Sequence, residues 1–256
     1  MQSFVHPQSV MRRIWGNSDT ILFIFAGAAA EFALNKAVDW LYFTGKLPKD
    51  PLGRLFSTVQ YARWIIFSPH DKATQAIQQM RHIHAAVEKS RGDTIPDWAY
   101  RDVLYMLIHY SIAAFELLER PLTDEEKEEV YDVFYRVGVG MGLTQLPQGY
   151  ANWLPSREAH LNADLQRSHY TDDLFVQYKK HLGSTRYTVL KAGQQLVVPT
   201  QVKALLGFPK YSWLGPVVPL YKFSRLLHLD GLIKHLLLPA AYKAQIKALN
   251  QPEEKR

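Results

Sequence analysis

The chain contains no cysteine among its 256 residues. That absence excludes disulfide bonds, thiolate nucleophiles, cysteine-bound zinc, iron–sulfur clusters and thiolate-ligated haem. Any metal would have to be held by the 10 histidines, by carboxylates or by a cofactor.

Several common catalytic motifs are also missing. The sequence has no P-loop lysine, no Gly-x-Ser-x-Gly elbow and no His-Glu-x-x-His, so the commonest phosphotransferase and hydrolase chemistries lack support. The glycines at 138, 140 and 142 imitate a dinucleotide fingerprint, which must open a helix after a strand. Here they follow an expected helix, and we interpret them as its C-terminal stop.

Long apolar runs are the third absence. The most apolar stretch, 21–30, is interrupted by Glu31, which makes it too short to span a bilayer. Apolar residues then continue at helical spacing, so we predict a buried first helix and not a signal peptide. We therefore expect a cytoplasmic protein and leave open a peripheral contact with a membrane.

The composition is that of a folded globular chain, with 47% hydrophobic and 21% charged residues. The length allows one large domain, and no clean linker or repeat is visible. We predict a single domain over 1–256, with its core in 17–165 and a basic helical extension over 199–250.

The net charge of +6 resides in the C-terminal part of the chain. Residues 201–256 hold nine lysines and arginines against three acidic residues, and the rest of the chain is balanced. The basic residues alternate with apolar and aromatic ones, which favours an amphipathic surface that could touch a membrane over a nucleic-acid groove. Nucleic acid is not an expected partner, and a plain solvated basic face is the alternative.

Apolar periodicity and capping signals predict an all-α fold. Asn17 and Thr123 are candidate N-caps, the latter in a capping box with Glu126. The expected helices cover 17–43, 54–66, 69–89, 96–120 and 124–142, with helical patterning again over 199–250. The segment 185–198 is the exception, because its pattern allows one short hairpin.

Two neighbouring helices carry polar groups suited to chemistry. Arg54 and Thr58 are four residues apart and therefore share one helix face, with Ser57 beside them. His82 and His84 are two apart on the next helix and cannot face the same centre. Any one of these side chains, taken singly, is an ordinary structural residue more often than a ligand.

Two further polar side chains lie in apolar surroundings. His109 needs a hydrogen-bond partner or a metal. Glu31 must be neutral, paired or functional, and an ion pair with Arg54 is its structural alternative.

The order of these segments resembles an oxygenase family, that of the rubber-cleaving latex clearing protein and the fungal ER-bound oxygenase MpaB. The resemblance covers most of the chain. It is carried by the apolar first helix, the Asp50-Pro-Leu-Gly-Arg-Leu-Phe-Ser-Thr58 segment, Arg81-x-x-His84-x-x-Val87, the run ending in His109, the Gly142-Leu-Thr-Gln-Leu-Pro147 turn, and 198–207.

The resemblance implies a globin-like helical fold that encloses haem b. It also implies an enzyme that cleaves isoprenoid carbon–carbon double bonds with dioxygen. It assigns Arg54 and Thr58 to the haem site and His84 as the axial ligand, with His109 as the second candidate or a further cofactor contact. Glu31 is the candidate for the family's catalytic glutamate. Ser57 stands where the family has a lysine that can bind iron, so an open distal face is expected.

From these residues we predict a haem b-dependent oxygenase that acts with dioxygen on a lipophilic unsaturated substrate, isoprenoid-like or aromatic. Two alternatives stand beside it. The chain could be a non-catalytic helical protein that binds lipid or a membrane surface, or a haem protein used for peroxide chemistry or sensing.

Overall fold

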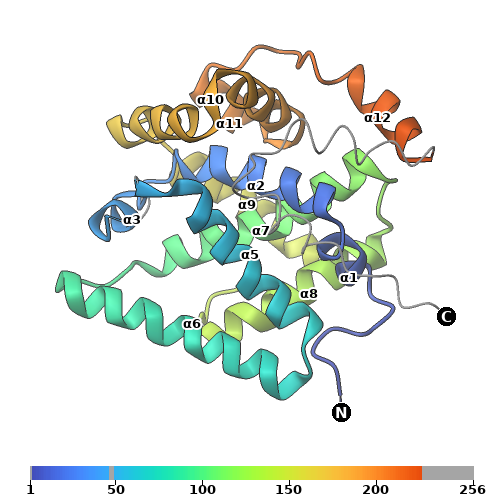
Figure 1. The fold of residues 1–256 in the computed structure, drawn as a ribbon. Coiled ribbons are helices and arrows are strands. Elements are labelled where there is room, and N and C mark those ends of the chain that lie inside the picture. The colour runs from blue at the N-terminus through green and yellow to red at the C-terminus, as the bar shows by residue number, and fades with distance from the viewer. Residues whose placement is uncertain (1, 46–48, 227–256) are drawn as a thin grey trace.

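A computed structural model describes residues 2–45 and 49–226, and these form a helical bundle (Figure 1). The helices are α1 (Val10–Trp15), α2 (Ser18–Phe32), α3 (Asp39–Phe43), α5 (Pro51–Phe67), α6 (His70–Arg91), α7 (Asp97–Leu118), α8 (Asp124–Met141), α9 (Tyr150–Ala163), α10 (His169–Val197), α11 (Thr200–Leu206) and α12 (Val217–Leu226). Within this part of the chain, extended backbone pairs only at two isolated bridges. The all-α prediction is confirmed.

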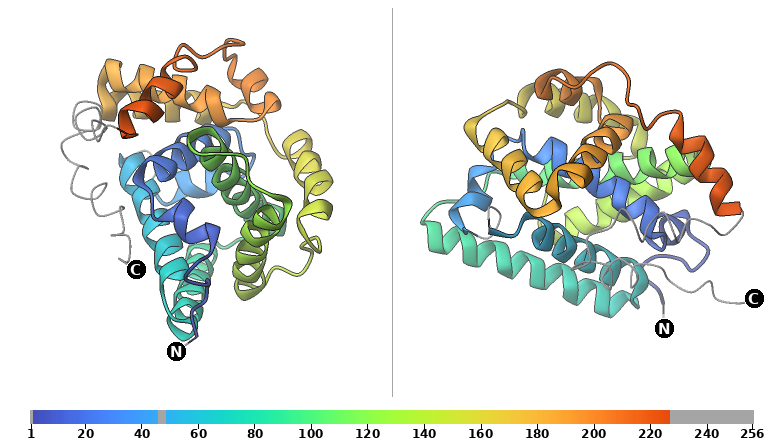
Figure 2. Two further views of the ribbon diagram at one scale, coloured as in Figure 1. Left: turned by 90° about the vertical axis from the view of Figure 1, so that its right-hand side faces the viewer. Right: turned by 45° about the horizontal axis from the view of Figure 1, so that its top comes forward.

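The helices α2 and α7 form the centre of the bundle. They approach so closely at Gly27 that a Cβ there would come within 2.2 Å of the Tyr110 ring. A hairpin of α5 and α6 packs on one side, and α10 with α11 lies on the other (Figures 1 and 2). The buried apolar cluster draws on nearly every helix from α1 to α11, so these layers share one core.

The first helix is shorter than predicted, because α2 ends at Phe32. The reason is Asn35, whose side-chain oxygen accepts a hydrogen bond from the Ala37 N–H at 2.8 Å and whose backbone pairs with Leu165. An asparagine that bonds its local backbone in this way competes with helix continuation. Helix α3 then forms as a separate short element.

The short hairpin that the pattern of 185–198 allows does not form. These residues belong to α10, which kinks at Gly183, where φ is 75°, and then continues to Val197. The face formed by Ala192, Gly193 and Val197 is buried against the bundle. Tertiary packing therefore overrides the local β preference of this stretch.

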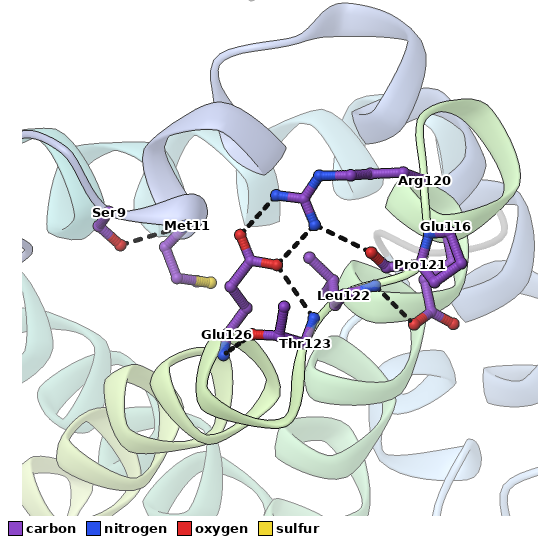
Figure 3. Close-up of polar contacts among 8 residues, drawn as sticks. All are labelled: Ser9, Met11, Glu116, Arg120, Pro121, Leu122, Thr123 and Glu126. Carbon is purple, nitrogen blue, oxygen red and sulfur yellow. Dashed lines mark hydrogen bonds and ion pairs between the residues drawn. The ribbon is translucent and has the colours of Figure 1, made fainter.

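The junction between α7 and α8 has the capping box that the sequence predicts (Figure 3). The Thr123 hydroxyl accepts from the Glu126 N–H at 3.2 Å, and Glu126 accepts in return from the Thr123 N–H at 3.1 Å. Arg120 adds a bidentate bond to the Glu126 carboxylate, both contacts 2.7 Å. Gly142 ends α8 with φ at 95°, as expected for a glycine stop.

The predicted C-terminal helical patterning is confirmed in part, by α11 and α12. The remainder, 227–250, lies outside the described residues. In the described ranges, no helix combines the length and the apolar character needed to cross a bilayer.

Candidate functional site

The α5–α6 hairpin sets the geometry of the site. Asp50 caps α5 by accepting from the Gly53 N–H at 2.8 Å, and Pro51 opens the helix. A Cβ at Gly53 would come within 2.0 Å of the Asp50 carboxylate, so in this arrangement the carboxylate occupies the space that glycine leaves open. After a tight turn at Ser68 and Pro69, α6 runs back along α5 and brings its second half beside residues 54–58 (Figure 1).

His84 projects from this second half of α6. Its Nδ1 lies 2.8 Å from the Met80 carbonyl oxygen, which can only accept, so Nδ1 carries the proton. Burial lowers the pKa of His84, and the positive charge of Arg54 lowers it further. The imidazole is therefore held neutral, with the Nε2 lone pair available to a ligand.

Arg54 lies close enough to His84 for its positive charge to lower the pKa of the imidazole. Its guanidinium donates to the Ser57 hydroxyl at 3.3 Å, and burial lowers the pKa of Arg54. Among the residues that the structure describes, no carboxylate pairs with it. A partly desolvated guanidinium without a counter-ion is suited to an anionic ligand group.

The hydroxyls of Ser57 and Thr58 flank Arg54 on α5. Both donate to the Arg54 carbonyl oxygen, at 2.8 and 3.2 Å, and both keep lone pairs that can accept. Neither can bind iron as a lysine amine can. The structure thus places Arg54 beside His84, with Ser57 and Thr58 next to Arg54 on α5.

Helix α7 closes another side of this group. The Tyr100 ring meets the His84 ring edge-on, with centroids 5.3 Å apart, and its hydroxyl donates to Glu88 at 3.2 Å. Val103 and Leu107 follow Tyr100 along the same face of α7, and all three are only partly buried. Tyr100 thus covers one side of the imidazole, and Val103 and Leu107 continue a partly buried apolar strip along α7.

The turn over 142–147 approaches the same region. Gly142 lies against the Arg81 guanidinium, which a Cβ would meet at 3.7 Å, and Gln145 accepts from Arg101 of α7 at 3.0 Å. Segments that the sequence analysis singled out separately therefore converge around α6 and α7.

Glu31 belongs to a different group. It is fully buried, and Arg157 of α9 binds its two carboxylate oxygens at 2.6 and 2.5 Å. The Tyr110 hydroxyl donates to it at 2.7 Å. The ion pair considered for Glu31 therefore exists, but its partner is Arg157 and not Arg54.

Asp102 is the second carboxyl group that lies near the Arg157 guanidinium, beside Glu31. Its carboxylate lies 3.5 Å from the guanidinium and accepts from the Asn35 amide. Burial raises the pKa of Asp102 to about 8, and the neighbouring Glu31 charge adds to the rise. Two buried carboxyl groups around one cation favour a proton on one of them.

Sequence analysis missed Arg157 and Asp102, although a signal was present. Arg157 lies on the same stripe of α9 as Trp153 and Leu161, four residues apart in each direction, and all three are buried. A charged residue on an otherwise buried stripe predicts a buried counter-ion.

His109 lies with this second group. Its Nε2 is 3.4 Å from the Val197 carbonyl of α10, and its ring meets the Tyr110 ring at 4.9 Å. No hydrogen bond or ring contact in the described part of the chain joins Glu31 or His109 to Arg54, Thr58 or His84. His82 is exposed on α6.

The described residues contain no group of three or more histidine and acidic side chains placed to bind a metal ion. This part of the chain therefore offers no set of side chains that could coordinate a metal ion directly.

A family model matches residues 12–228, and its description is ER-bound oxygenase mpaB/B′/rubber oxygenase, catalytic domain. The chain belongs to this oxygenase family. The match extends from α1 to the end of α12 and includes both polar groups. Comparison with curated proteins and with solved structures found no match.

A first prediction concerns the buried ion pair of Arg157 with Glu31. Arg157→Met should lower the free energy of unfolding by about 3–5 kcal/mol, because it leaves Glu31 buried without its counter-ion. Arg167→Met removes the exposed pair with Asp172 and should cost no more than about 1 kcal/mol. Urea denaturation measures both, and equal effects would contradict the account of the buried pair.

A second prediction concerns acid stability. Burial, assisted by Arg157, lowers the pKa of His109 to about 4, so the unfolded chain binds a proton more readily than the folded one. His109 alone should therefore cost on the order of 2 kcal/mol of stability as pH drops from about 6.5 towards 4. The raised pKa of Asp102 acts in the opposite direction over this range, so the His109 contribution is the difference between the parent and His109→Gln in urea titrations at several pH values. A difference that does not change with pH would show that His109 does not titrate there.

Proposed function

We propose that this oxygenase depends on haem b and uses dioxygen on a lipophilic unsaturated substrate, isoprenoid-like or aromatic. The observation that carries the proposal is the closeness of the neutral His84 imidazole to the Arg54 guanidinium across the α5–α6 hairpin. Among the described residues, no hydrogen bond engages the imidazole Nε2 and no carboxylate pairs with the guanidinium. Family membership supports the oxygenase part.

The residues present fit a haem. His84 offers one neutral nitrogen whose tautomer is fixed by the Met80 carbonyl, the usual state of a proximal ligand. Tyr100, Val103 and Leu107 of α7 would offer an apolar face to a porphyrin. When bound, haem supplies the activation of dioxygen, which no side chain of this chain can perform.

The polar groups on α5 then have defined tasks. Arg54 can donate hydrogen bonds to negative charge that develops on dioxygen during reaction. Thr58 can hold a water molecule through its free lone pairs, beside Arg54 on the same face. Ser57 offers a hydroxyl and no nitrogen, so it would not act as an iron ligand.

Glu31 and His109 enter this proposal as supporting residues. Arg157 and Tyr110 already occupy both oxygens of Glu31, so it is poorly placed to take a proton from substrate. Its pair with Arg157 instead ties α2 to α9 behind the site. His109 links α7 to α10 in the same region.

The substrate should be apolar because the face of α7 beside His84 is apolar and only partly covered. The rubber oxygenase in the family description acts on a polyisoprenoid, which agrees with that chemistry.

Oxygen uptake tests the proposed reaction. The haem-loaded protein should consume dioxygen with squalene and form carbonyl products, but should remain inactive with squalane, which has the same skeleton and no double bond. Equal rates of dioxygen uptake with squalene and with squalane would contradict the proposal. Activity that requires hydrogen peroxide and proceeds without dioxygen would favour the peroxidase alternative.

A further inference from the structure

The segment that ends the described chain carries an unusual surface. Tyr211, Trp213, Leu220 and Phe223 are 76, 55, 69 and 61% exposed, and Val217 is exposed beside them. Val217, Leu220 and Phe223 recur every three residues on one side of α12. We call these five side chains the α12 patch.

The opposite side of α12 is anchored through polar contacts. The Tyr221 hydroxyl donates to Asp19 of α2 at 2.8 Å, and Arg225 pairs with Glu119 at 2.7 Å. Lys222 donates to the Glu119 carbonyl at 2.9 Å. The usual arrangement of a surface helix, apolar side inward, is thus reversed. Helix α12 lies at the edge of the bundle beside the end of α7, as Figures 1 and 2 show.

The chemistry of the patch is that of a bilayer interface. Tyrosine and tryptophan are favoured at lipid headgroups, where one end of the ring is apolar and the other is wet. The α12 patch places five exposed aromatic or aliphatic side chains within 13 residues of chain. On an ordinary protein surface, exposed apolar residues are scattered singly.

The segment that carries the patch has basic residues and no acidic one. Residues 201–226 contain four basic residues. Lys222 and Arg225 are bound to Glu119 on the anchored side of α12, and the exposed Lys210 directly precedes Tyr211. The following residues to 256 bring the total to nine basic and three acidic, which equals the net charge of the whole chain. Anionic headgroups attract such a segment by about 1 kcal/mol per basic residue.

We propose that the α12 patch docks onto an anionic lipid surface. Its aromatic and aliphatic side chains enter the interface while the polar side of α12 stays bound to α2 and α7. A lipophilic substrate partitions into the same bilayer, so docking would bring the enzyme to it. That last step rests on the proposed function, whereas docking itself does not.

Vesicle sedimentation of the full chain tests the proposal without haem or turnover. The protein should bind vesicles of phosphatidylcholine with phosphatidylserine, and should bind pure phosphatidylcholine more weakly. Leu220→Ser with Phe223→Ser should weaken binding about tenfold or more, since each loses most of its apolar area. Val176→Ser, at a residue that is 60% exposed on α10, should bind like the parent.

Two results would overturn the proposal. One is parent-like vesicle binding by the Leu220→Ser/Phe223→Ser variant, which would place any membrane contact elsewhere, such as in 227–256. The other is no vesicle binding together with a dimer, seen by light scattering, that the same variant abolishes. A second copy of the chain would then be the occupant.

Discussion

His84→Ala is expected to abolish stoichiometric haem binding and leave the helical circular dichroism nearly unchanged. The imidazole is the one side chain in its group with a fixed tautomer and an unused nitrogen, so its removal leaves iron without a protein ligand. His84 is only partly buried and bonds only its own helix, which is why the fold should survive. Titration with haemin, followed at the Soret band, measures the loss.

His82→Ala is the matched control for this experiment. His82 lies two residues away on the same helix but is exposed, so its variant should bind haem like the parent. Equal haem occupancy in His84→Ala and the parent would refute the assignment. In that case, haem loss in His109→Ala would transfer the ligand role to the second histidine.

Arg54→Lys is expected to reduce turnover by about a hundredfold to a thousandfold, the usual loss for one preorganised donor. Lysine keeps the charge but cannot reproduce the planar fork that Arg54 presents beside His84. Thr58→Val should lower turnover in the same direction by removing the neighbouring hydroxyl. Because these donors act on charge that develops during reaction, kcat should fall more than substrate affinity.

Arg63→Lys is the control on the same helix. Arg63 donates to the Trp15 backbone and stacks on Phe67, so it belongs to the packing of α5 against α1. Its variant should keep parental turnover per bound haem. Parental turnover in both Arg54→Lys and Thr58→Val, with haem retained, would show that this pair is structural.

The sequence was a good guide wherever a signal acts locally. The capping box at Thr123 and the glycine stop at 142 depend on residues within one turn, and the structure has both of them. The face shared by Arg54 and Thr58 follows from helical spacing alone. Their placement opposite His84 follows from the hairpin.

The failures concern contacts between distant segments. The stretch 185–198 has β-branched and aromatic residues, yet its buried face packs as a helix against α2, which no local pattern reveals. The end of α2 depends on Asn35, whose partners Asp102 and Leu165 lie far along the chain. A partner for Glu31 was expected, but choosing Arg157 over Arg54 required the fold.

The absorption spectrum of the purified parent chain after haemin addition tests the central claim most directly. The account predicts a Soret band that saturates at one haem per chain, with a high-spin or water-ligated ferric spectrum, because Ser57 provides no second nitrogen ligand. Absence of a band beyond that of free haemin would contradict haem dependence. A low-spin, nitrogen-ligated spectrum that persists in His82→Ala and His109→Ala would contradict the open face.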